Sequence, residues 1–128
     1  MCSVLIVEDT PVVREPLERL LRYEGYETVA ASNGVEALEA MRRRTPDVIL
    51  LDVAMPKMNG VRFLQQLRGE ERWRGVPVIL LTAVMDTTQL RLARELCVRE
   101  VLFKPKFTVQ DLLEQIRMCI RPSNVVTA

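Results

Sequence analysis

The chain contains no histidine and only three cysteines, and each scarcity excludes a class of function. Without histidine, the chain itself provides neither Ser-His nor Cys-His nucleophilic catalysis, and no histidine that could carry a phosphoryl group. Cys2, Cys97 and Cys119 are odd in number and widely spaced. A zinc site or a disulfide framework is therefore not expected, and the sequence predicts reduced thiols in a cytoplasmic protein.

Long apolar runs and an excess of charge of one sign are also missing. No stretch approaches the roughly 20 apolar residues of a membrane span, and the N-terminus lacks the pattern of a secretory signal. The 18 basic residues nearly balance the 17 acidic ones, which argues against a nucleic-acid arm or a polybasic membrane patch. At 128 residues and 48% hydrophobic content, the chain can form one domain with a core. We expect that domain over residues 1–121 and a tail or linker stub over 122–128.

Short, continuous apolar runs alternate with segments of helical spacing. Continuous rather than alternating runs are typical of strands covered on both faces of a parallel sheet, and right-handed crossovers then give an α/β fold. Strands are predicted at 3–7, 27–31, 47–51, 76–81 and 101–103. Helices are predicted after Thr10 and Asn33, from Gly60, from about 86 to 97, and from Val109. The spacing places apolar side chains of two helices toward the core: Val35, Leu38 and Met41, and Val109, Leu112, Leu113, Ile116 and Ile120.

Four of the predicted strands end at residues that can take part in phosphoryl chemistry: Glu8 and Asp9, Asp52, Thr82, and Lys104. Open α/β sheets bind ligands at the edge where the carboxyl ends of the strands meet. Three carboxylates at that edge would repel one another by roughly 4 kcal/mol per pair at an effective dielectric near 20. Proteins keep such clusters where a cation binds or a proton is shared. Mg²⁺ is the hard cation that takes few carboxylates, keeps waters and accepts phosphate oxygens.

This arrangement predicts transfer of a phosphoryl group to a carboxylate. Asp52 would be the nucleophile, and Lys104, with the metal, would neutralise charge in the transition state. With 15 arginines and only three lysines in the chain, a lysine at this position is not the default cation. Any one of these residues alone is more often structural, and the prediction rests on their joint occurrence. The product would draw Thr82 inward through a hydrogen bond worth about 1.5 to 3 kcal/mol, as expected of a switch rather than an enzyme.

Five segments carry a family resemblance, and they occur in this order along the chain: VLIVED from Val4, VILLDVAMP from Val48, MNG from Met58, VILLTA from Val78 and FKP from Phe103. Together they resemble the response-regulator receiver domain of two-component signalling, over about Ser3 to Arg121. The resemblance implies a flavodoxin-like parallel sheet of five strands in the order 2-1-3-4-5, with five helices. It also implies phosphotransfer from a histidine kinase or phosphotransfer protein, and control of a downstream protein or output domain. Direct nucleic-acid binding and membrane association are not expected.

The resemblance also assigns roles to individual residues. It implies that Asp52 is the phosphoacceptor and Thr82 the switch hydroxyl, and that Lys104 contacts the phosphoryl group. The implied magnesium ligands are Glu8, Asp9, Asp52 and the main-chain carbonyl of Ala54. Ala54 and Val84 stand at positions that influence hydrolysis in the family, and neither side chain can orient a water. Slow self-dephosphorylation is therefore expected.

Two departures from the family pattern bear on the alternatives. Val101 replaces the usual aromatic residue, which favours a phosphorylation-independent interaction module, whereas the intact acidic set argues against it. Glu8 replaces the more frequent aspartate and is expected to bind magnesium through water. A flavodoxin is disfavoured because the loop that would cradle the FMN phosphate begins with Glu8 and Asp9, whose negative charges would repel that phosphate. A phosphatase with an aspartate nucleophile would need a second aspartate where Ala54 stands.

Overall fold

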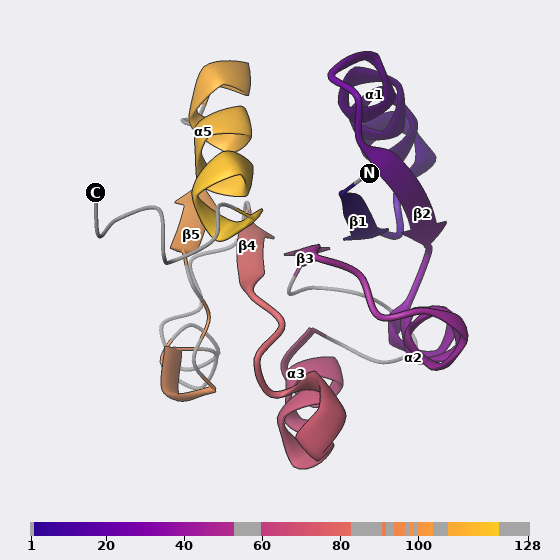
Figure 1. The fold of residues 1–128 in the computed structure, drawn as a ribbon, viewed down its shortest axis with the longest axis vertical. Coiled ribbons are helices and arrows are strands. Elements are labelled where there is room, and N and C mark those ends of the chain that lie inside the picture. Colours follow the sequence, from indigo (N-terminus) through magenta and orange to yellow (C-terminus); the bar gives the residue numbers. More distant parts are fainter. Residues whose placement is uncertain are drawn as a thin grey trace.

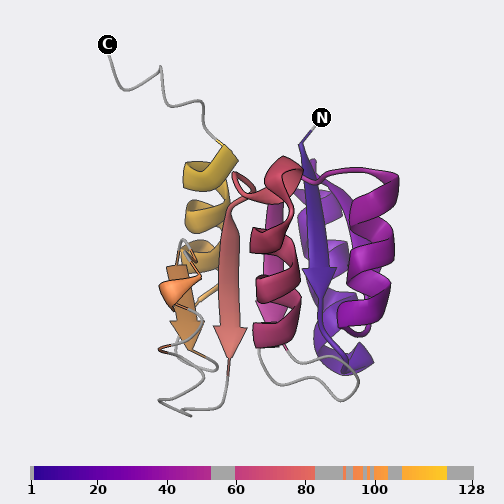
Figure 2. The ribbon, with the colours of Figure 1, turned by 90° about the horizontal axis from the view of Figure 1, so that it is seen from below.

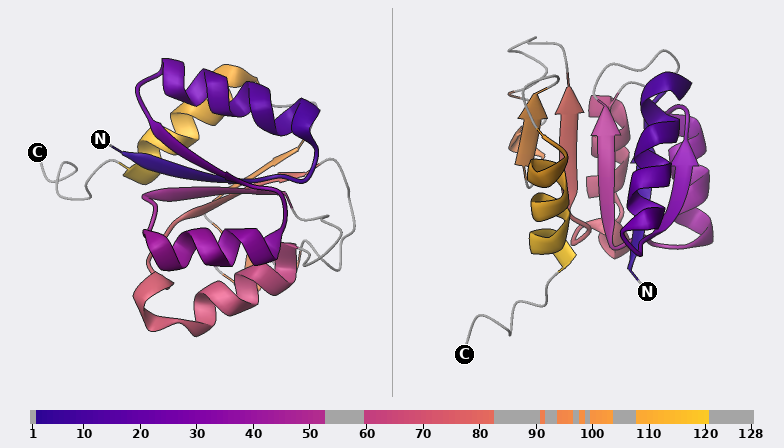
Figure 3. Two further views of the ribbon diagram at one scale, coloured as in Figure 1. Left: turned by 90° about the vertical axis from the view of Figure 1, so that its right-hand side faces the viewer. Right: turned by 90° about the horizontal axis from the view of Figure 1, so that it is seen from above.

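A computed structural model describes residues 2–52, 60–82, 91, 94–96, 98, 100–103 and 108–120. Five parallel strands form one sheet in the order β2-β1-β3-β4-β5, as predicted. The strands are β1 (Ser3–Val7), β2 (Glu27–Ala31), β3 (Val48–Asp52), β4 (Val78–Thr82) and β5 (Glu100–Phe103). The helices α1 (Pro11–Tyr23) and α5 (Val109–Ile120) cover one face, and α2 (Gly34–Arg43) and α3 (Gly60–Gly69) cover the other (Figures 1 and 3). The helix predicted near 86–97 falls largely outside the described residues.

The continuous apolar runs supply both core layers of the sheet. Successive side chains of a strand point to opposite faces, so Leu5 and Ile49 pack in the layer with α2 and α3, whereas Ile6 and Leu50 pack in the layer with α1 and α5. All residues of β1 are buried, and so are the apolar residues of β3. Burial on both faces explains why these strands lack the alternation of polar and apolar residues that a half-exposed strand shows.

The predicted helix ends are largely confirmed. Asn33 Oδ1 accepts the Glu36 N–H at 2.9 Å and so caps α2. Thr10 occupies the N-cap position of α1, but its side chain makes no capping hydrogen bond. Gly25 follows α1 with a φ of 96°, a backbone conformation that glycine adopts without strain. Among the described residues, no helix is both long and apolar enough to span a membrane.

Two sequence predictions about burial were wrong. Val35 is 45% exposed and Val109 is 51% exposed. The buried stripe of α2 centres on Ala37 and Met41, which leaves Val35 at its margin. Val109 is the first residue of α5 and has helical neighbours on one side only. The connection between α3 and β4 contains the short 3-10 helix η1 (Glu71–Trp73), and its Trp73 is buried in the layer of α2 and α3, with 2% of its surface exposed.

Arg68, near the end of α3, ties three parts of the chain together. Its Nε donates to the Leu96 carbonyl at 2.9 Å, and its Nη1 donates to the carbonyls of Arg74 at 2.9 Å and Val76 at 3.0 Å. The planar guanidinium presents several donors in a fixed fork, so one side chain can satisfy carbonyls that no helix or strand pairs. Arg68 therefore links the segment between α3 and β4 to the main chain at Leu96.

Arg68→Ala is expected to lower the free energy of unfolding by about 2 to 3 kcal/mol, because it removes hydrogen bonds from a charged donor to partly buried carbonyls. Arg72→Ala is the matched control. The Arg72 guanidinium lies 4.4 Å from the centre of the Trp73 ring, and an exposed contact of this kind contributes about 0.5 to 1 kcal/mol. Urea unfolding followed by circular dichroism measures both variants. Equal losses in the two variants would contradict the role given to Arg68.

Candidate functional site

The strand ends that carry the predicted site residues lie side by side at the carboxyl edge of the sheet. Figure 2 shows the strands running in the same direction toward this edge. Neighbouring strands in a sheet are about 4.8 Å apart, so residues at or just beyond paired positions are close in space. The pairs nearest this edge are Val7 with Leu51, Asp52 with Leu81, and Thr82 with Phe103. The backbone register therefore brings together the ends of β1, β3, β4 and β5.

Glu8, Asp9 and Asp52 form a cluster of carboxylates at this edge. Each offers an oxygen, and these oxygens all lie within 4.8 Å of one another. Glu8 is buried, with 3% of its surface exposed, whereas Asp9 and Asp52 are half-buried. The structure thus confirms that the three acidic side chains predicted from the sequence meet, although they come from segments more than 40 residues apart in the chain.

The turn between β1 and α1 is held by main-chain hydrogen bonds. The Glu8 N–H donates to the Ala31 carbonyl at 3.0 Å, which extends the pairing of β1 with β2 by one residue. Arg14 Nη1 donates to the Glu8 carbonyl at 2.9 Å and to the Asp9 carbonyl at 3.4 Å. The Thr10 N–H donates to Glu8 Oε2 at 3.3 Å. These contacts fix the backbone that carries two of the three acidic side chains.

Sequence reasoning missed Arg14. A signal was nevertheless present, because a cation near the N-terminus of a helix opposes the helix dipole and so calls for a specific acceptor. Here the acceptors are main-chain carbonyls of the acidic turn. The guanidinium also places positive charge beside the carboxylate cluster.

The donor set of the cluster fits a hard divalent cation. Carboxylate oxygens are the ligands that Mg²⁺ prefers, and Mg²⁺ usually takes only one or two of them and keeps several waters. Three carboxylates whose oxygens approach within 4.8 Å, one of them buried, are a costly arrangement without a compensating positive charge. Glu8, Asp9 and Asp52 together can therefore hold such an ion.

Several predicted site residues cannot be placed. Lys104, Ala54 and Val84 lie outside the residues that the structure describes. For Thr82 the backbone alone is described, as the last residue of β4. Lys104 follows directly after Phe103, the residue of β5 that pairs with Thr82. The register is thus consistent with the predicted constellation at Thr82 and Lys104, while their side chains stay predictions.

Comparison with known proteins identifies the family. Residues 4–117 match the family model described as the response regulator receiver domain. A curated relative, the probable transcriptional regulatory protein TcrX of Mycobacterium tuberculosis, is 37% identical over 125 residues, which is 98% of this chain and 52% of that protein. The chain thus spans about half the length of this relative.

Solved structures agree with this match. The receiver domain of a signal transduction histidine kinase from Syntrophus aciditrophicus superposes with a TM-score of 0.86 at 32% identity, over 94% of this chain and 90% of that one. The receiver domain of a Pseudomonas aeruginosa sensor histidine kinase, which has a magnesium ion coordinated in its active-site cleft, gives a TM-score of 0.84 at 29% identity, over 93% and 97%. The flavodoxin-like fold is confirmed, and the chain belongs to the response regulator receiver domain family.

Proposed function

We propose that the chain is a phosphorylation-activated signalling switch in which Asp52 accepts a phosphoryl group from a histidine kinase or a phosphotransfer protein. The observation that carries this proposal is the cluster of Glu8, Asp9 and Asp52, whose oxygens lie within 4.8 Å of one another at the carboxyl edge of the sheet. Membership of the receiver family, whose members are signalling proteins, supports the same conclusion.

Asp52 is suited to the role of nucleophile by its position. It is the last residue of β3, preceded by four buried apolar residues, and it is itself half-buried. Partial burial limits the hydration of its carboxylate, while the exposed part can meet a donor. In the proposed step a carboxylate oxygen forms a bond to phosphorus while the bond between phosphorus and the donor breaks. Lys104 would contact the phosphoryl oxygens as a compact ammonium.

In this proposal Glu8, Asp9, Asp52 and the main-chain carbonyl of Ala54 hold Mg²⁺. When bound, the ion offsets the negative charge of the cluster and of the phosphoryl oxygens. The magnesium ion in the Pseudomonas receiver domain supports the assignment. Arg14 acts as a positioning residue, because it holds the main chain of Glu8 and Asp9 and touches neither carboxylate in the contacts described.

The switch would follow from the charge of the product. A phosphoryl group adds nearly two negative charges at the end of β3, and the Thr82 hydroxyl at the end of the neighbouring β4 can donate to it. One such bond, worth about 1.5 to 3 kcal/mol, biases a two-state loop without fixing it, since a full population swing needs about 5.5 kcal/mol. The altered surface would then control a downstream protein or output domain, without direct contact with nucleic acid or membrane.

The proposed domain occupies residues 1–121, slightly beyond the family match at 4–117. A cytoplasmic location is part of the proposal, because three widely spaced cysteines are not the pattern of a disulfide framework, and a reducing compartment keeps such thiols reduced.

Incubation with Mg²⁺ and a small phosphodonor such as acetyl phosphate is expected to add one phosphoryl group, visible as a mass increase in intact mass spectrometry. Asp52→Asn should abolish the increase. Asp47→Asn is the matched control, because Asp47 precedes the same strand at its other end, where its Oδ2 accepts the Ser3 N–H at 2.7 Å. Absence of the increase in the parent chain would instead favour the interaction module that Val101 suggests. A mass increase that persists in Asp52→Asn would show that another residue is the phosphoacceptor.

Arg14→Ala is expected to lower the affinity for Mg²⁺ by roughly tenfold, the scale on which residues that orient metal ligands act. Loss of the positive charge alone would raise the affinity for a cation, so a fall isolates the positioning effect. Arg14→Lys should recover part of the loss, and Arg19→Ala, on the exposed side of the same helix, should change little. Isothermal titration calorimetry measures all four proteins. A higher affinity in Arg14→Ala would contradict the positioning role.

The phosphorylated chain is expected to lose its phosphoryl group slowly. Polar side chains at Ala54 and Val84, introduced together as Ala54→Asn and Val84→Glu, should shorten the half-life by roughly tenfold or more by orienting a water. Met118→Asn, at an exposed position near the end of α5, is the control. Mass spectrometry over time gives the half-lives, and an unchanged half-life in the double variant would count against the expectation.

A further inference from the structure

Strand β2 lies at the edge of the sheet and pairs only with β1 among the described strands. The Glu27 N–H donates to the Cys2 carbonyl at 2.9 Å, and the Ala31 carbonyl accepts the Glu8 N–H at 3.0 Å. Backbone groups of successive residues in a strand point to opposite sides. Those of Glu27, Val29 and Ala31 therefore face β1, whereas those of Thr28 and Ala30 point away from the sheet.

The outer side of β2 is open. A groove of about 510 Å³ lies at the first residues of β2 and of its neighbour β1, with Ser3 to Leu5 and Glu27 to Val29 in its lining. Both flanking helices contribute to its walls, with Arg22 from α1 and Arg43 from α2. Val29, which also lines the groove, is 48% exposed. An apolar side chain beside outward backbone groups is a ready template for pairing with another strand, which proteins usually cover or block. Figure 3 (left) shows this edge between α1 on one face and α2 on the other.

Helix α1 presents its charges to this edge in a fixed order. Arg22, in its last turn, donates from Nε to Thr28 Oγ1 at 2.9 Å and pairs through Nη2 with Glu18 Oε2 at 3.1 Å. Glu18 precedes Arg22 by one helical turn. The side of α1 beside β2 therefore carries an acidic residue first and a basic residue last.

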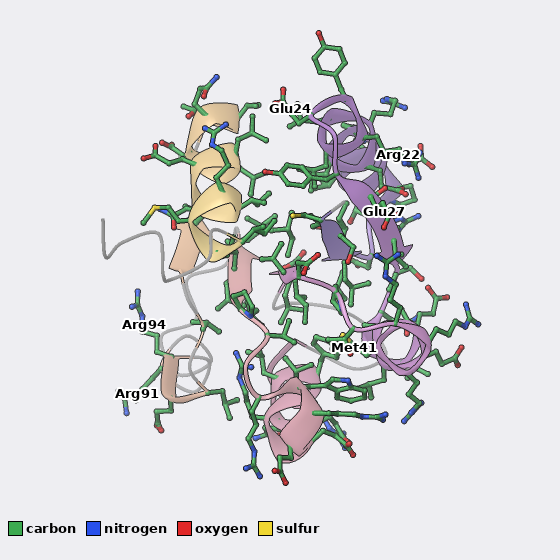
Figure 4. All side chains as sticks on the ribbon, viewed as in Figure 1. Arg22, Glu24, Glu27, Met41, Arg91 and Arg94 are labelled. Atoms are coloured by element: carbon green, nitrogen blue, oxygen red, sulfur yellow. The ribbon has the colours of Figure 1, made fainter. Side chains whose placement is uncertain are left out.

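Helix α2 follows the same order on the opposite face. Glu36 lies in its first turn and accepts the Ser32 N–H, just beyond β2, at 2.8 Å. Arg43 and Arg44, at its end, line the groove, and Arg44 Nη1 lies 2.8 Å from Glu27 Oε1 at the start of β2. Figure 4 shows Arg22 and Glu27 at this edge. Both helices that flank the strand thus carry basic residues near the start of β2 and acidic residues nearer its end.

We propose that the partner of this edge is a second copy of the chain, joined by antiparallel pairing of the two β2 strands about a twofold axis at Val29. In that register Thr28 faces Ala30 of the second copy, and the outward groups form about four backbone hydrogen bonds. The two Val29 side chains become cross-strand neighbours on the face covered by α2. The two sheets join into one.

Charge complementarity selects this occupant and this orientation. An antiparallel arrangement sets the basic end of each flanking helix beside the acidic end of the same helix in the second copy. A parallel arrangement would place like charges together. A peptide whose charges are all of one sign would complement only one end of this edge, whereas a second copy complements both the basic and the acidic end. The contact is small, so the dimer is weak and depends on concentration.

Sedimentation of the chain over a concentration series to the millimolar range tests the proposal, and reversible dimerisation is expected. Ala30→Pro removes one outward donor from each copy and leaves the bonds to β1 intact, so it should raise the dissociation constant by about tenfold or more. Arg43→Glu should also raise it. Arg42→Glu makes the same charge change at a neighbouring exposed position that does not line the groove, and it should raise the constant less.

Amide hydrogen exchange on the unaltered chain gives a second measurement that does not depend on the folding of any variant. The amides of Thr28 and Ala30 should exchange more slowly as the concentration rises, whereas that of Val29, which faces β1, should not change. A chain that stays monomeric throughout the series would overturn the proposal. So would a dimer that Ala30→Pro leaves intact, or a dimer that Arg42→Glu and Arg43→Glu weaken equally.

Discussion

Three carboxylates held within 4.8 Å of one another are the constraint on which the site depends. The sheet imposes this proximity, because β1 and β3 are neighbours in register and both are covered on each face. Neither strand can shift by one residue without turning its buried side chains to the other layer. The hydrophobic core therefore fixes the positions of acidic side chains that would otherwise separate, and a bound cation can offset their repulsion.

Arginines stabilise the segments that the sheet does not reach. Arg14 holds the acidic turn after β1, and Arg68 holds the segment after α3, each by donating to main-chain carbonyls. A guanidinium suits this task because it offers several donors in one plane and stays charged. The chain has 15 arginines and three lysines. Arginines make these structural contacts, and the proposed chemical role at the strand ends belongs to Lys104, whose ammonium is a compact point charge.

Much of this arrangement could be predicted from the sequence, because it follows from periodicity and topology. The bounds of β1 and β2 were predicted as the structure has them, and the meeting of Glu8 and Asp52 follows from strand order alone. Burial of Trp73 could not be predicted, because a short 3-10 helix shows no repeating pattern. Arg14 was missed for a similar reason, since hydrogen bonds to main-chain carbonyls leave little trace in the choice of neighbouring residues.

The free energy of unfolding of Asp52→Asn, measured against the parent chain with a chelator and again with Mg²⁺, tests most directly whether the acidic cluster is a cation site. With the chelator the difference between the two proteins should be small, because the variant loses the contacts of Asp52 and also one of three mutually repelling charges. With Mg²⁺ the parent should become the more stable protein by a clearly larger margin, because it gains more from binding the ion in its folded state. The cation site would be contradicted if Mg²⁺ left the free energy of unfolding of the parent chain unchanged. It would also be contradicted if the variant were less stable than the parent by the same amount in both conditions.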